Sequence, residues 1–509
     1  MEWTSFLYFF GSITITYILS NYVQGFLWNN KYQDGTDKKP WPESPSGLPF
    51  FGQGYEAFRR GYARVFTQWS RELGSGVISV PLVQKRVIVL NTGSAVKQAL
   101  VDRDQCNSSR SEKTNDTVEM VMSDQAKTVF TATFSLYWAR LRRGIHKVIG
   151  RDRVSQFDPV FEAQSRNLCE SIKEEEATLQ VDELRELVDT VALEATLAMV
   201  VKQEGPLDQV TKQRIIEICR KTQDIQTSAW YFRYSPFVQF AKVVSVLMYG
   251  TNSITRLRNE LLDIVLGLQG PKVKPGSIAA ALERTEPSKN DPEPVQLTHA
   301  EIAVNLVHLT LHGYQMLSSA LFTLIQRLAS LPELQERMYK QLTAADDKAL
   351  VHAFVLESLR FNPPCRIYSH TSRVDHDLEI DGTEYRVDDG TPLVVNLDNI
   401  HFDSTSYRDP HTFNPDRFLA ASADISVLDK PVKGKYAKDH LTFGVGRRAC
   451  QGSLASQRLM AAVVEALVLR YKLRGGDPDT QIDLHSGVWS WTGRTETKGV
   501  AVEFSARRR

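Results

Sequence analysis

The chain contains the segment Phe443-Gly444-Val445-Gly446-Arg447-Arg448-Ala449-Cys450-Gln451-Gly452, in which an aromatic residue, glycines and arginines surround a cysteine. Gly446 and Gly452 allow the backbone to turn tightly and to direct amide groups at the cysteine sulfur. An apolar run over 454–473 predicts a helix that begins just after Cys450, and the positive end of a helix dipole stabilises a thiolate. Phe443 can shield the sulfur from water. The segment therefore predicts a protected cysteine thiolate, the form in which cysteine ligates a metal.

Three further motifs precede this segment in the chain. They read Trp138-Ala139-Arg140-Leu141-Arg142, Glu357-Ser358-Leu359-Arg360 and Phe413-Asn414-Pro415-Asp416-Arg417-Phe418. Taken singly, the first is typical of an amphipathic surface helix and the second of a solvated ion pair between residues three apart. In this order, however, they match the WxxxR, ExxR and PxRF motifs that precede FxxGxRxCxG in cytochromes P-450. The chain resembles that family from about residue 40 to about residue 505, and resembles its fungal microsomal members most.

The resemblance implies a haem b cofactor whose iron is ligated by the thiolate of Cys450. The other residues expected to contact the haem or its propionates are Trp138, Arg142, Arg373, Phe443, Gly446, Arg448 and Gly452, with His370 and Arg366 as alternatives to Arg373. The resemblance also implies a structural cluster of Glu357, Arg360 and Arg417. A carboxylate between two guanidiniums is tolerated in a protein interior only when it is fully hydrogen-bonded.

The expected fold is mainly α: the cytochrome P-450 fold, a helical haem domain with a smaller β region, plus an N-terminal transmembrane helix. We expect the anchor at 3–28, a proline-rich hinge at 29–49 and the catalytic domain at 50–509. Apolar positions at helical spacing predict helices over 155–203 and 208–226, and Thr298-His299-Ala300-Glu301 predicts a capping box that opens a helix reaching about residue 331. Short strands are expected near 77–80, 86–91 and within 378–395.

The N-terminal 3–28 segment is apolar and aromatic and contains no Asp, Glu, Lys or Arg. At roughly 1.5 Å per residue it can span a bilayer about 30 Å thick. Glu2 precedes the segment whereas Lys31, Lys38 and Lys39 follow it, so the positive-inside rule places the catalytic domain in the cytosol, on the endoplasmic reticulum membrane. A cleaved signal peptide is the alternative, but a basic start is missing and a cleavage site is weak.

Composition limits the partners. The 509 residues carry a net charge of +1, which offers no bulk attraction to nucleic acid. The length leaves no room for a flavin domain, so electrons are expected from a separate NADPH–cytochrome P-450 reductase, and we expect a monomer. Five cysteines without regular spacing argue against a disulfide framework, and all except Cys450 are interpreted as ordinary thiols.

The sequence departs from the family on the helix that should cover the oxygen-binding side of the haem. The family's A/G-G-x-D/E-T pattern is replaced by His312-Gly313-Tyr314-Gln315-Met316. Gly313 is kept and is expected to open the groove for dioxygen. However, Gln315 cannot act as a general acid near neutral pH, and Met316 donates no hydrogen bond. Gly313, Gln315 and Met316 are therefore the candidate catalytic positions, and the last two differ from the family's pattern.

Three outcomes remain open. Waters, Ser318, Ser319 or a substrate hydroxyl can relay protons in an ordinary hydroxylase. Alternatively, the enzyme catalyses an oxidative rearrangement, cyclisation or coupling, or a redox-neutral isomerisation that needs no relay. A haem-thiolate sensor is the non-enzymatic alternative.

A hydrophobic small molecule, an intermediate of fungal secondary metabolism, is the expected substrate, with His312, Tyr314, Trp489 and Trp491 as candidate contacts. Aromatic side chains suit a bulky apolar ligand, although they equally suit ordinary core packing.

Overall fold

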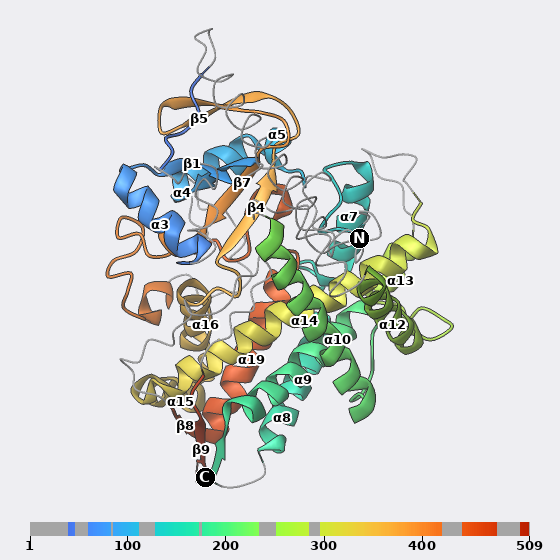
Figure 1. Cartoon of the computed structure of the whole chain (residues 1–509). Helices are drawn as coiled ribbons and strands as arrows, with labels where there is room; N and C mark the ends of the chain where they lie inside the picture. The colour runs from blue at the N-terminus through green and yellow to red at the C-terminus, as the bar shows by residue number, and fades with distance from the viewer. Residues whose placement is uncertain are drawn as a thin grey trace, which may run out of the picture.

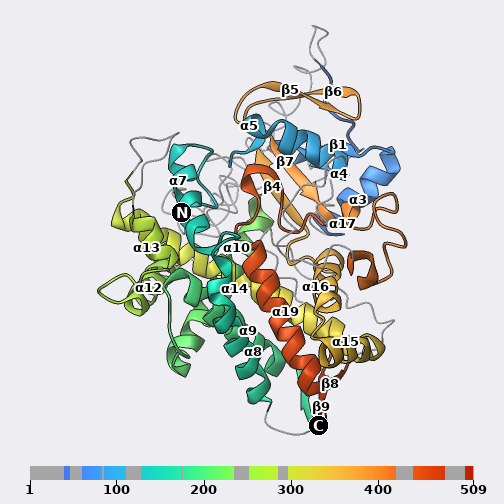
Figure 2. The same cartoon turned by 180° about the vertical axis from the view of Figure 1, so that it is seen from behind.

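The computed structural model describes residues 39–45, 60–82, 85–110, 128–172, 176–233, 251–284, 296–419, 440–475 and 499–507, without the side chains of 82, 85, 224–233 and 251–254. A large helical body occupies one end of the molecule and a smaller β region the other (Figure 1). The view from behind shows α19 (Ser453–Arg470) running beside α14 (His299–Ala329) through the helical body (Figure 2).

Helix α14 is the axis of the helical body. The predicted capping box is confirmed at its start: the Thr298 hydroxyl accepts the Glu301 backbone N–H at 3.2 Å, and the Glu301 carboxylate accepts the Thr298 N–H at 2.9 Å. The helix is apolar around most of its circumference because it packs against α9 (Val181–Val200), α12 (Thr251–Gln269), α16 (Ala349–Phe361) and α19. It ends at Ala329, and Pro332 then opens the next helix.

The remaining helices surround this axis or cover the β region. They are α3 (Tyr62–Leu73), α4 (Gly93–Lys97), α5 (Asp104–Asn107), α7 (Leu136–Ile149), α8 (Asp158–Ser171), α10 (Gln209–Arg233), α13 (Ile278–Glu283), α15 (Pro332–Ala345) and α17 (Leu397–Ile400).

The β region holds a four-stranded sheet in the order β1-β2-β7-β4, with β1 (Val77–Leu82), β2 (Lys85–Leu90), β7 (Pro392–Asn396) and β4 (Ile367–Thr371). Only the β2–β7 pair is parallel. A two-stranded sheet joins β5 (His376–Ile380) to β6 (Thr383–Val387), and β3 (Glu176–Leu179), β9 (Val502–Ala506) and β8 (Tyr471–Arg474) form a third sheet beside the helices. The strands expected near 77–80, 86–91 and within 378–395 are confirmed.

The prediction of helix over the whole of 155–203 is wrong in its middle. Residues 176–179 form β3, which pairs antiparallel with β9 more than three hundred residues later in the chain. A partner so distant in sequence leaves no local signal, so helical spacing on either side of the strand concealed it.

The proline-rich segment is docked where the structure describes it, over 39–45. Lys39 forms ion pairs with Asp377 at 2.9 Å and Glu384 at 2.8 Å, on the two strands of the β5–β6 hairpin. The Arg86 guanidinium lies 5.3 Å from the centre of the Trp41 ring. The Ser79 backbone N–H donates to the carbonyl of residue 43 at 2.8 Å. This part of the expected hinge is therefore fixed to the β region.

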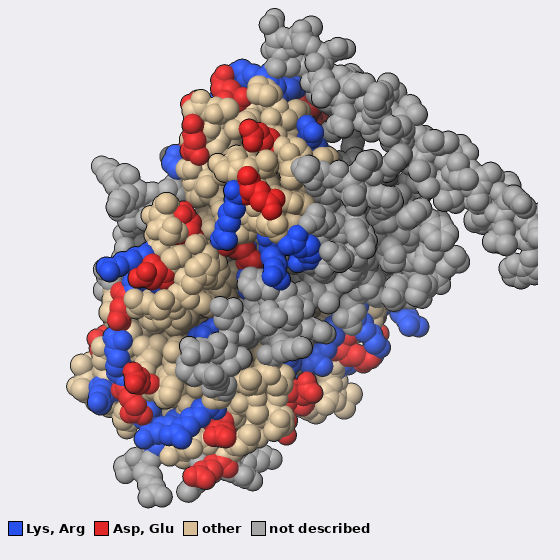
Figure 3. All heavy atoms as spheres, turned by 60° about the vertical axis from the view of Figure 1, so that its left-hand side comes forward, with Lys and Arg blue, Asp and Glu red and all other residues tan. Residues whose placement is uncertain are grey.

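No helix among the described residues is long and apolar enough to cross a membrane, and the expected anchor at 3–28 lies outside them. One face of the molecule shows Lys and Arg side chains interspersed with Asp and Glu (Figure 3). The described part of that face therefore has no extended field of a single sign.

Candidate functional site

The loop around Cys450 lies between the two regions of the fold. The Cys450 backbone N–H donates to the Phe443 carbonyl at 2.8 Å, which closes the loop on itself. Gly446 has φ 64°, a left-handed conformation, and a side chain there would meet the backbone carbonyl of Leu100. Gly452 caps α19, so Cys450 lies just before the N-terminus of that helix, and a Cβ on Gly452 would lie 3.8 Å from the cysteine sulfur. The loop geometry therefore suits a metal-ligating thiolate.

Arg142 contacts this loop, and the charges of Arg110 and Arg142 act on Arg448 within it. Arg142 of α7 donates to the Ala449 carbonyl at 2.9 Å and interacts electrostatically with Cys450. Burial lowers the pKa of Arg142. Arg448 donates to the carbonyls of Ser108, at 2.8 Å, and Ala132. Part of its side chain is accessible to solvent, yet burial of the guanidinium, with the charges of Arg110 and Arg142, holds its pKa well below the usual arginine value.

No described carboxylate pairs with Arg142 or Arg448, which hydrogen-bond to backbone carbonyls instead. Desolvated guanidiniums that repel one another are costly unless an anion joins them. A porphyrin that carries two propionates supplies such an anion, and the cysteine beside it supplies an axial ligand. The residues present therefore fit a haem.

Trp138 lies within the same group. The Arg448 and Arg142 guanidiniums are 4.4 Å and 5.2 Å from the centre of its ring. Its indole N–H donates to the Val129 carbonyl at 3.1 Å. The ring thus holds two like charges side by side through cation–π contacts, while the N–H expected to meet a propionate bonds to backbone in this structure.

Arg373, the first choice for a further propionate contact, is exposed, and its guanidinium lies 5.6 Å from the centre of the Phe134 ring. The structure does not bring it among the other arginines. His370, one of the alternatives, is buried, and its Nδ1 lies 3.1 Å from the Asn107 carbonyl oxygen. Burial together with the charges of Arg110 and Arg448 holds its pKa well below the usual histidine value. The other alternative, Arg366, forms an ion pair with Asp398. The buried place of His370 near Arg110 and Arg448 therefore favours it over Arg373 and Arg366 as the further propionate contact.

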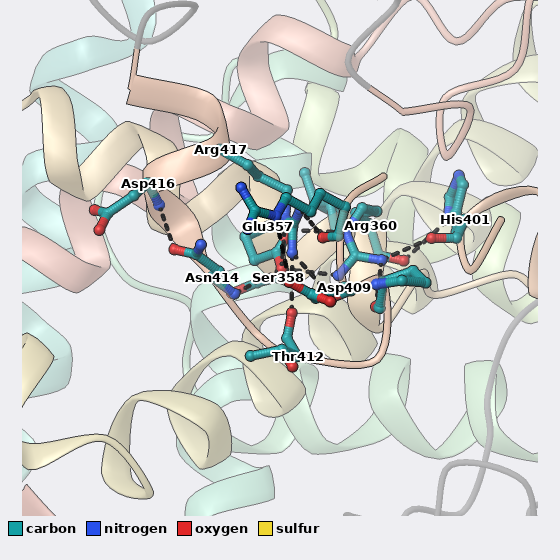
Figure 4. A network of polar contacts seen from close by, with 12 residues as sticks. Glu357, Ser358, Arg360, His401, Asp409, Thr412, Asn414, Asp416 and Arg417 are labelled. Carbon is teal, nitrogen blue, oxygen red and sulfur yellow. Dashed lines mark hydrogen bonds and ion pairs between the residues drawn. The ribbon is translucent and has the colours of Figure 1, made fainter. Parts of the chain in front are cut away.

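The second arginine cluster contains its own carboxylate (Figure 4). Glu357 is fully buried and accepts two hydrogen bonds from Arg360, at 2.7 and 2.8 Å, and one from Arg417 at 3.2 Å. The backbone N–H of Asn414 adds a fourth at 2.8 Å. Arg360 also donates to the carbonyls of His401, at 2.6 Å, and Pro410. The three residues predicted to cluster are thus brought together from α16 and the 3₁₀ turn Pro415–Phe418.

Comparison with known proteins decides the family. The cytochrome P-450 family model matches residues 42–491. The chain belongs to the cytochrome P-450 family. It is thus a haem-thiolate monooxygenase, an oxidoreductase that incorporates oxygen from O₂.

Fungal P-450 monooxygenases are among its relatives. The chain is 24% identical to cytochrome P-450 monooxygenase 79 of Postia placenta, a match that covers 88% of this chain and 85% of that protein. It is 23% identical to phenylacetate 2-hydroxylase of Emericella nidulans, covering 84% and 82% of the two chains. A shorter match, 28% identical to cytochrome P-450 monooxygenase pgmC of Aspergillus terreus, covers 38% of each.

Solved P-450 structures share the fold. A zebrafish cytochrome P-450 with progesterone superposes with a TM-score of 0.67 at 18% identity, covering 88% of this chain and 99% of that one. A cyanobacterial P-450 with bound retinoic acid gives 0.69 at 16% identity, covering 92% and 100%. The mainly helical P-450 fold with a small β region is therefore confirmed.

The residues expected on the oxygen side, 312–316, lie on α14, and the structure gives them different surroundings. Gly313 faces α9, where an added Cβ would lie 2.8 Å from Thr196 Cγ2, so its small size serves a helix contact. Gln315 is buried, and its side-chain amide donates to the Cys219 carbonyl of α10 at 3.3 Å. Tyr314 is also buried and interacts with Arg220 of α10, which does not suit a substrate contact. His312 and Met316, one turn apart on one face, are half-buried.

Sequence reasoning missed two features of this P-450. Arg110, which lies between the β region and α7, donates to the carbonyls of Phe130, at 3.3 Å, and Ser369. Asp189 of α9 is buried, accepts a hydrogen bond from Ser318 of α14 and pairs with Arg220 at 2.7 Å. Neither residue lies in a motif, so only the tertiary structure brings them to the site. Trp489 and Trp491, the remaining predicted contacts, lie outside the described residues.

Proposed function

We propose that this P-450 is anchored in the endoplasmic reticulum membrane and oxidises a hydrophobic small molecule, an intermediate of fungal secondary metabolism. The observation that carries the proposal is the pairing of the Cys450 loop with buried arginines that no described carboxylate neutralises. That combination suits an iron ligand beside the anionic edge of a porphyrin. The fungal relatives, one of which is a phenylacetate 2-hydroxylase, support a small-molecule substrate.

In this proposal Cys450 ligates the iron, and the guanidiniums of Arg110, Arg142 and Arg448 bind the propionates. Trp138 keeps two of these guanidiniums in place. When bound, a thiolate-ligated haem supplies the electron density that favours O–O cleavage. The protein's own task is to hold the thiolate, exclude water and orient the substrate.

Electrons are proposed to come from a membrane-bound NADPH–cytochrome P-450 reductase. Arg143 and Lys147 on α7 and Arg447 in the cysteine loop lie on the segments nearest the thiolate side, where an acidic partner could dock. Lys433 and Lys435, which are proposed to belong to the same surface, lie outside the described residues. The family requires a redox partner, and the monomeric state remains part of the proposal.

The anchor proposal rests on the apolar 3–28 segment and on the lysines that follow it. It places the catalytic domain on the cytosolic side, with hinge residues 29–38 between the anchor and the docked segment. A lipophilic substrate dissolved in the bilayer would then have a short path to the enzyme.

A second outcome is favoured by a specific observation. Gln315 binds backbone of α10 and Met316 donates no hydrogen bond, so neither supplies a proton as an acid–alcohol pair does. An enzyme built this way can end its reaction in rearrangement, cyclisation, coupling or isomerisation rather than hydroxylation. The sensor alternative requires that no turnover occurs with reductase and NADPH.

Replacement of the ligand tests the haem-thiolate assignment. Cys450→Ala should abolish the thiolate-type spectrum of the reduced carbon monoxide complex, whereas the control Cys106→Ala, half-buried and outside the loop, should keep it. A thiolate-type spectrum in Cys450→Ala would refute the assignment.

Metabolite analysis distinguishes the reaction types. Deletion of the gene in the native host, followed by high-resolution mass spectrometry, compares the accumulated intermediate with the lost product. A gain of one oxygen identifies a hydroxylase or epoxidase. A loss of two hydrogens or an unchanged mass identifies coupling, cyclisation or isomerisation.

A further inference from the structure

Helix α14 presents one face to the segment that holds the arginines. Residues three or four apart share a side of a helix, so Asn305, His308, His312, Met316 and Ser319 form one stripe along α14. The Asn305 side-chain carbonyl accepts the Val129 backbone N–H at 2.9 Å, and His308 Nδ1 lies 3.1 Å from the Thr128 hydroxyl. The N-terminal part of the stripe, Asn305 and His308, is thus covered by residues 128–130.

This covering segment belongs to the proposed haem site. The Val129 carbonyl accepts hydrogen bonds from Trp138 and from Arg448, and the Phe130 carbonyl accepts one from Arg110. The same few residues therefore contact α14 on one side and the propionate-binding arginines on the other. A side chain on the stripe just beyond this segment borders the oxygen side of the site.

His312 occupies that position. Its ring centre lies 4.5 Å from that of Phe130 and 5.3 Å from that of His308, so two aromatic neighbours fix its orientation. His308 is fully buried, whereas His312 is half-buried, like Met316 one turn later. An imidazole can both donate and accept a proton, which neither Gln315 nor Met316 can do.

The other polar groups of this part of α14 bond elsewhere. Gln315 donates to the Cys219 carbonyl of α10 at 3.3 Å, and Ser318 donates to the buried carboxylate of Asp189 on α9. Ser318 lies on a different side of α14 from His312, and the amide of Gln315, three residues beyond His312, is engaged by α10. Ser319, on the His312 stripe, is the remaining rival for the role of proton donor.

We propose that His312 is the hydrogen-bond donor on the oxygen side of this P-450, positioned by Phe130, in place of the family's acid–alcohol pair. The inference rests on the proposed function, because it requires the haem beside Cys450. Its role is to donate a hydrogen bond from an imidazole nitrogen to a ligand or substrate oxygen beside the haem.

The test uses the full-length, haem-loaded protein and carbon monoxide as the probe, because carbon monoxide binds on the oxygen side and needs no substrate. A hydrogen-bond donor beside bound carbon monoxide lowers its C–O stretching frequency. His312→Phe keeps an aromatic ring beside Phe130 and removes the donor, so the infrared band should move to higher frequency. His312→Gln restores a donor and should move the band part of the way back.

Two further variants make the result specific. His299→Phe changes an exposed histidine at the start of the same helix and should leave the band in place. Ser319→Ala removes the rival donor and should also leave it in place. An unmoved band in His312→Phe, or the same movement in Ser319→Ala, overturns the inference.

Phe130→Leu tests the positioning without altering the histidine. It should broaden the band, because His312 would take several orientations, and an unchanged band width would show that Phe130 does not position it. If His312→Phe fails to fold, the absence of any difference between wild type and Phe130→Leu also overturns the inference. A wild-type protein without a thiolate-type reduced carbon monoxide spectrum would instead refute the proposed function.

Discussion

The molecule contains two groups of buried or half-buried arginines that differ in where their negative charge comes from. In the group around Glu357, a carboxylate within the chain accepts hydrogen bonds from Arg360 and Arg417, so the charges are balanced by the protein itself. In the group of Arg110, Arg142 and Arg448, no described carboxylate pairs with Arg142 or Arg448, and burial lowers the pKa of both. The first arrangement is typical of a structural cluster and the second of a site for an anionic ligand.

The largest effect is expected where the internal charge balance is broken. Glu357→Gln should destabilise the fold by about 3–5 kcal/mol, because it leaves two desolvated guanidiniums without their carboxylate. The measurement is the yield of soluble, haem-loaded protein together with its urea unfolding midpoint. Wild-type stability in this variant would contradict a structural role for the cluster.

Loss of a guanidinium from the second group should act on the ligand more than on the fold. Arg448→Met should weaken haem retention by at least about tenfold, since a buried charged partner of a propionate is removed. The molar ratio of haem to purified protein measures this effect. The soluble yield should fall less than in Glu357→Gln. An equal fall in yield with full haem content would show that Arg448 stabilises the fold rather than the haem.

Acid should weaken the fold through histidines that border each group. Burial holds the pKa values of His401 and His370 well below the usual histidine value. His401 Nδ1 donates to the Arg360 carbonyl at 2.9 Å while Nε2 accepts the Leu441 N–H at 3.0 Å, which requires a neutral ring.

The direction of the pH effect follows from these depressed values. Below about pH 6.5 the unfolded chain binds protons that the folded chain excludes, so stability falls as the pH falls, by up to about 1.4 kcal/mol per pH unit for each histidine. His401→Gln should reduce this slope, measured as the urea midpoint between neutral and mildly acidic pH. An unchanged slope would show that His401 does not contribute to it.

The smallest effect is expected at Arg447, the sequence neighbour of Arg448. Its guanidinium pairs with Asp104 at 2.6 Å, and 40% of its side chain is exposed. Arg447→Gln should therefore cost no more than about 1 kcal/mol and leave the haem content unchanged. A loss of haem as large as that in Arg448→Met would show that charge near the loop, rather than buried position, retains the cofactor.

The internally balanced group could be predicted from the sequence, whereas the externally balanced one could only be predicted in part. Glu357, Arg360 and Arg417 lie in motifs, and two of them are neighbours on one helix. Cys450 and Arg448 were identified in the same way. His370 was identified from the sequence only as an alternative to Arg373. Arg110 was not identified, because its neighbour Ser109 pairs with Thr371 at the end of β4, far away in the sequence. Pairing between distant strands, like that of β3 with β9, has no local signal.

The altered α14 segment shows a different limit of sequence reasoning. Comparison with the family's pattern marks 312–316 as unusual, yet it cannot say which side of the helix each residue faces. In the structure Gly313 packs on Thr196 and Tyr314 is buried next to Arg220, so two of the five predicted site positions serve helix packing. Sequence position identifies the turn of the helix, and tertiary contacts assign the roles.

If the proposed anchor holds, the attachment of Lys39 to Asp377 and Glu384 limits the distance between the enzyme and the bilayer. With an anchor that ends at residue 28, the connection from there to residue 39 can span at most about 40 Å when fully extended. The β5–β6 hairpin would therefore stay within that distance of the lipid surface. Raised ionic strength screens the two half-exposed carboxylates. It should therefore weaken their attraction to Lys39 and allow a greater distance between the hairpin and the membrane.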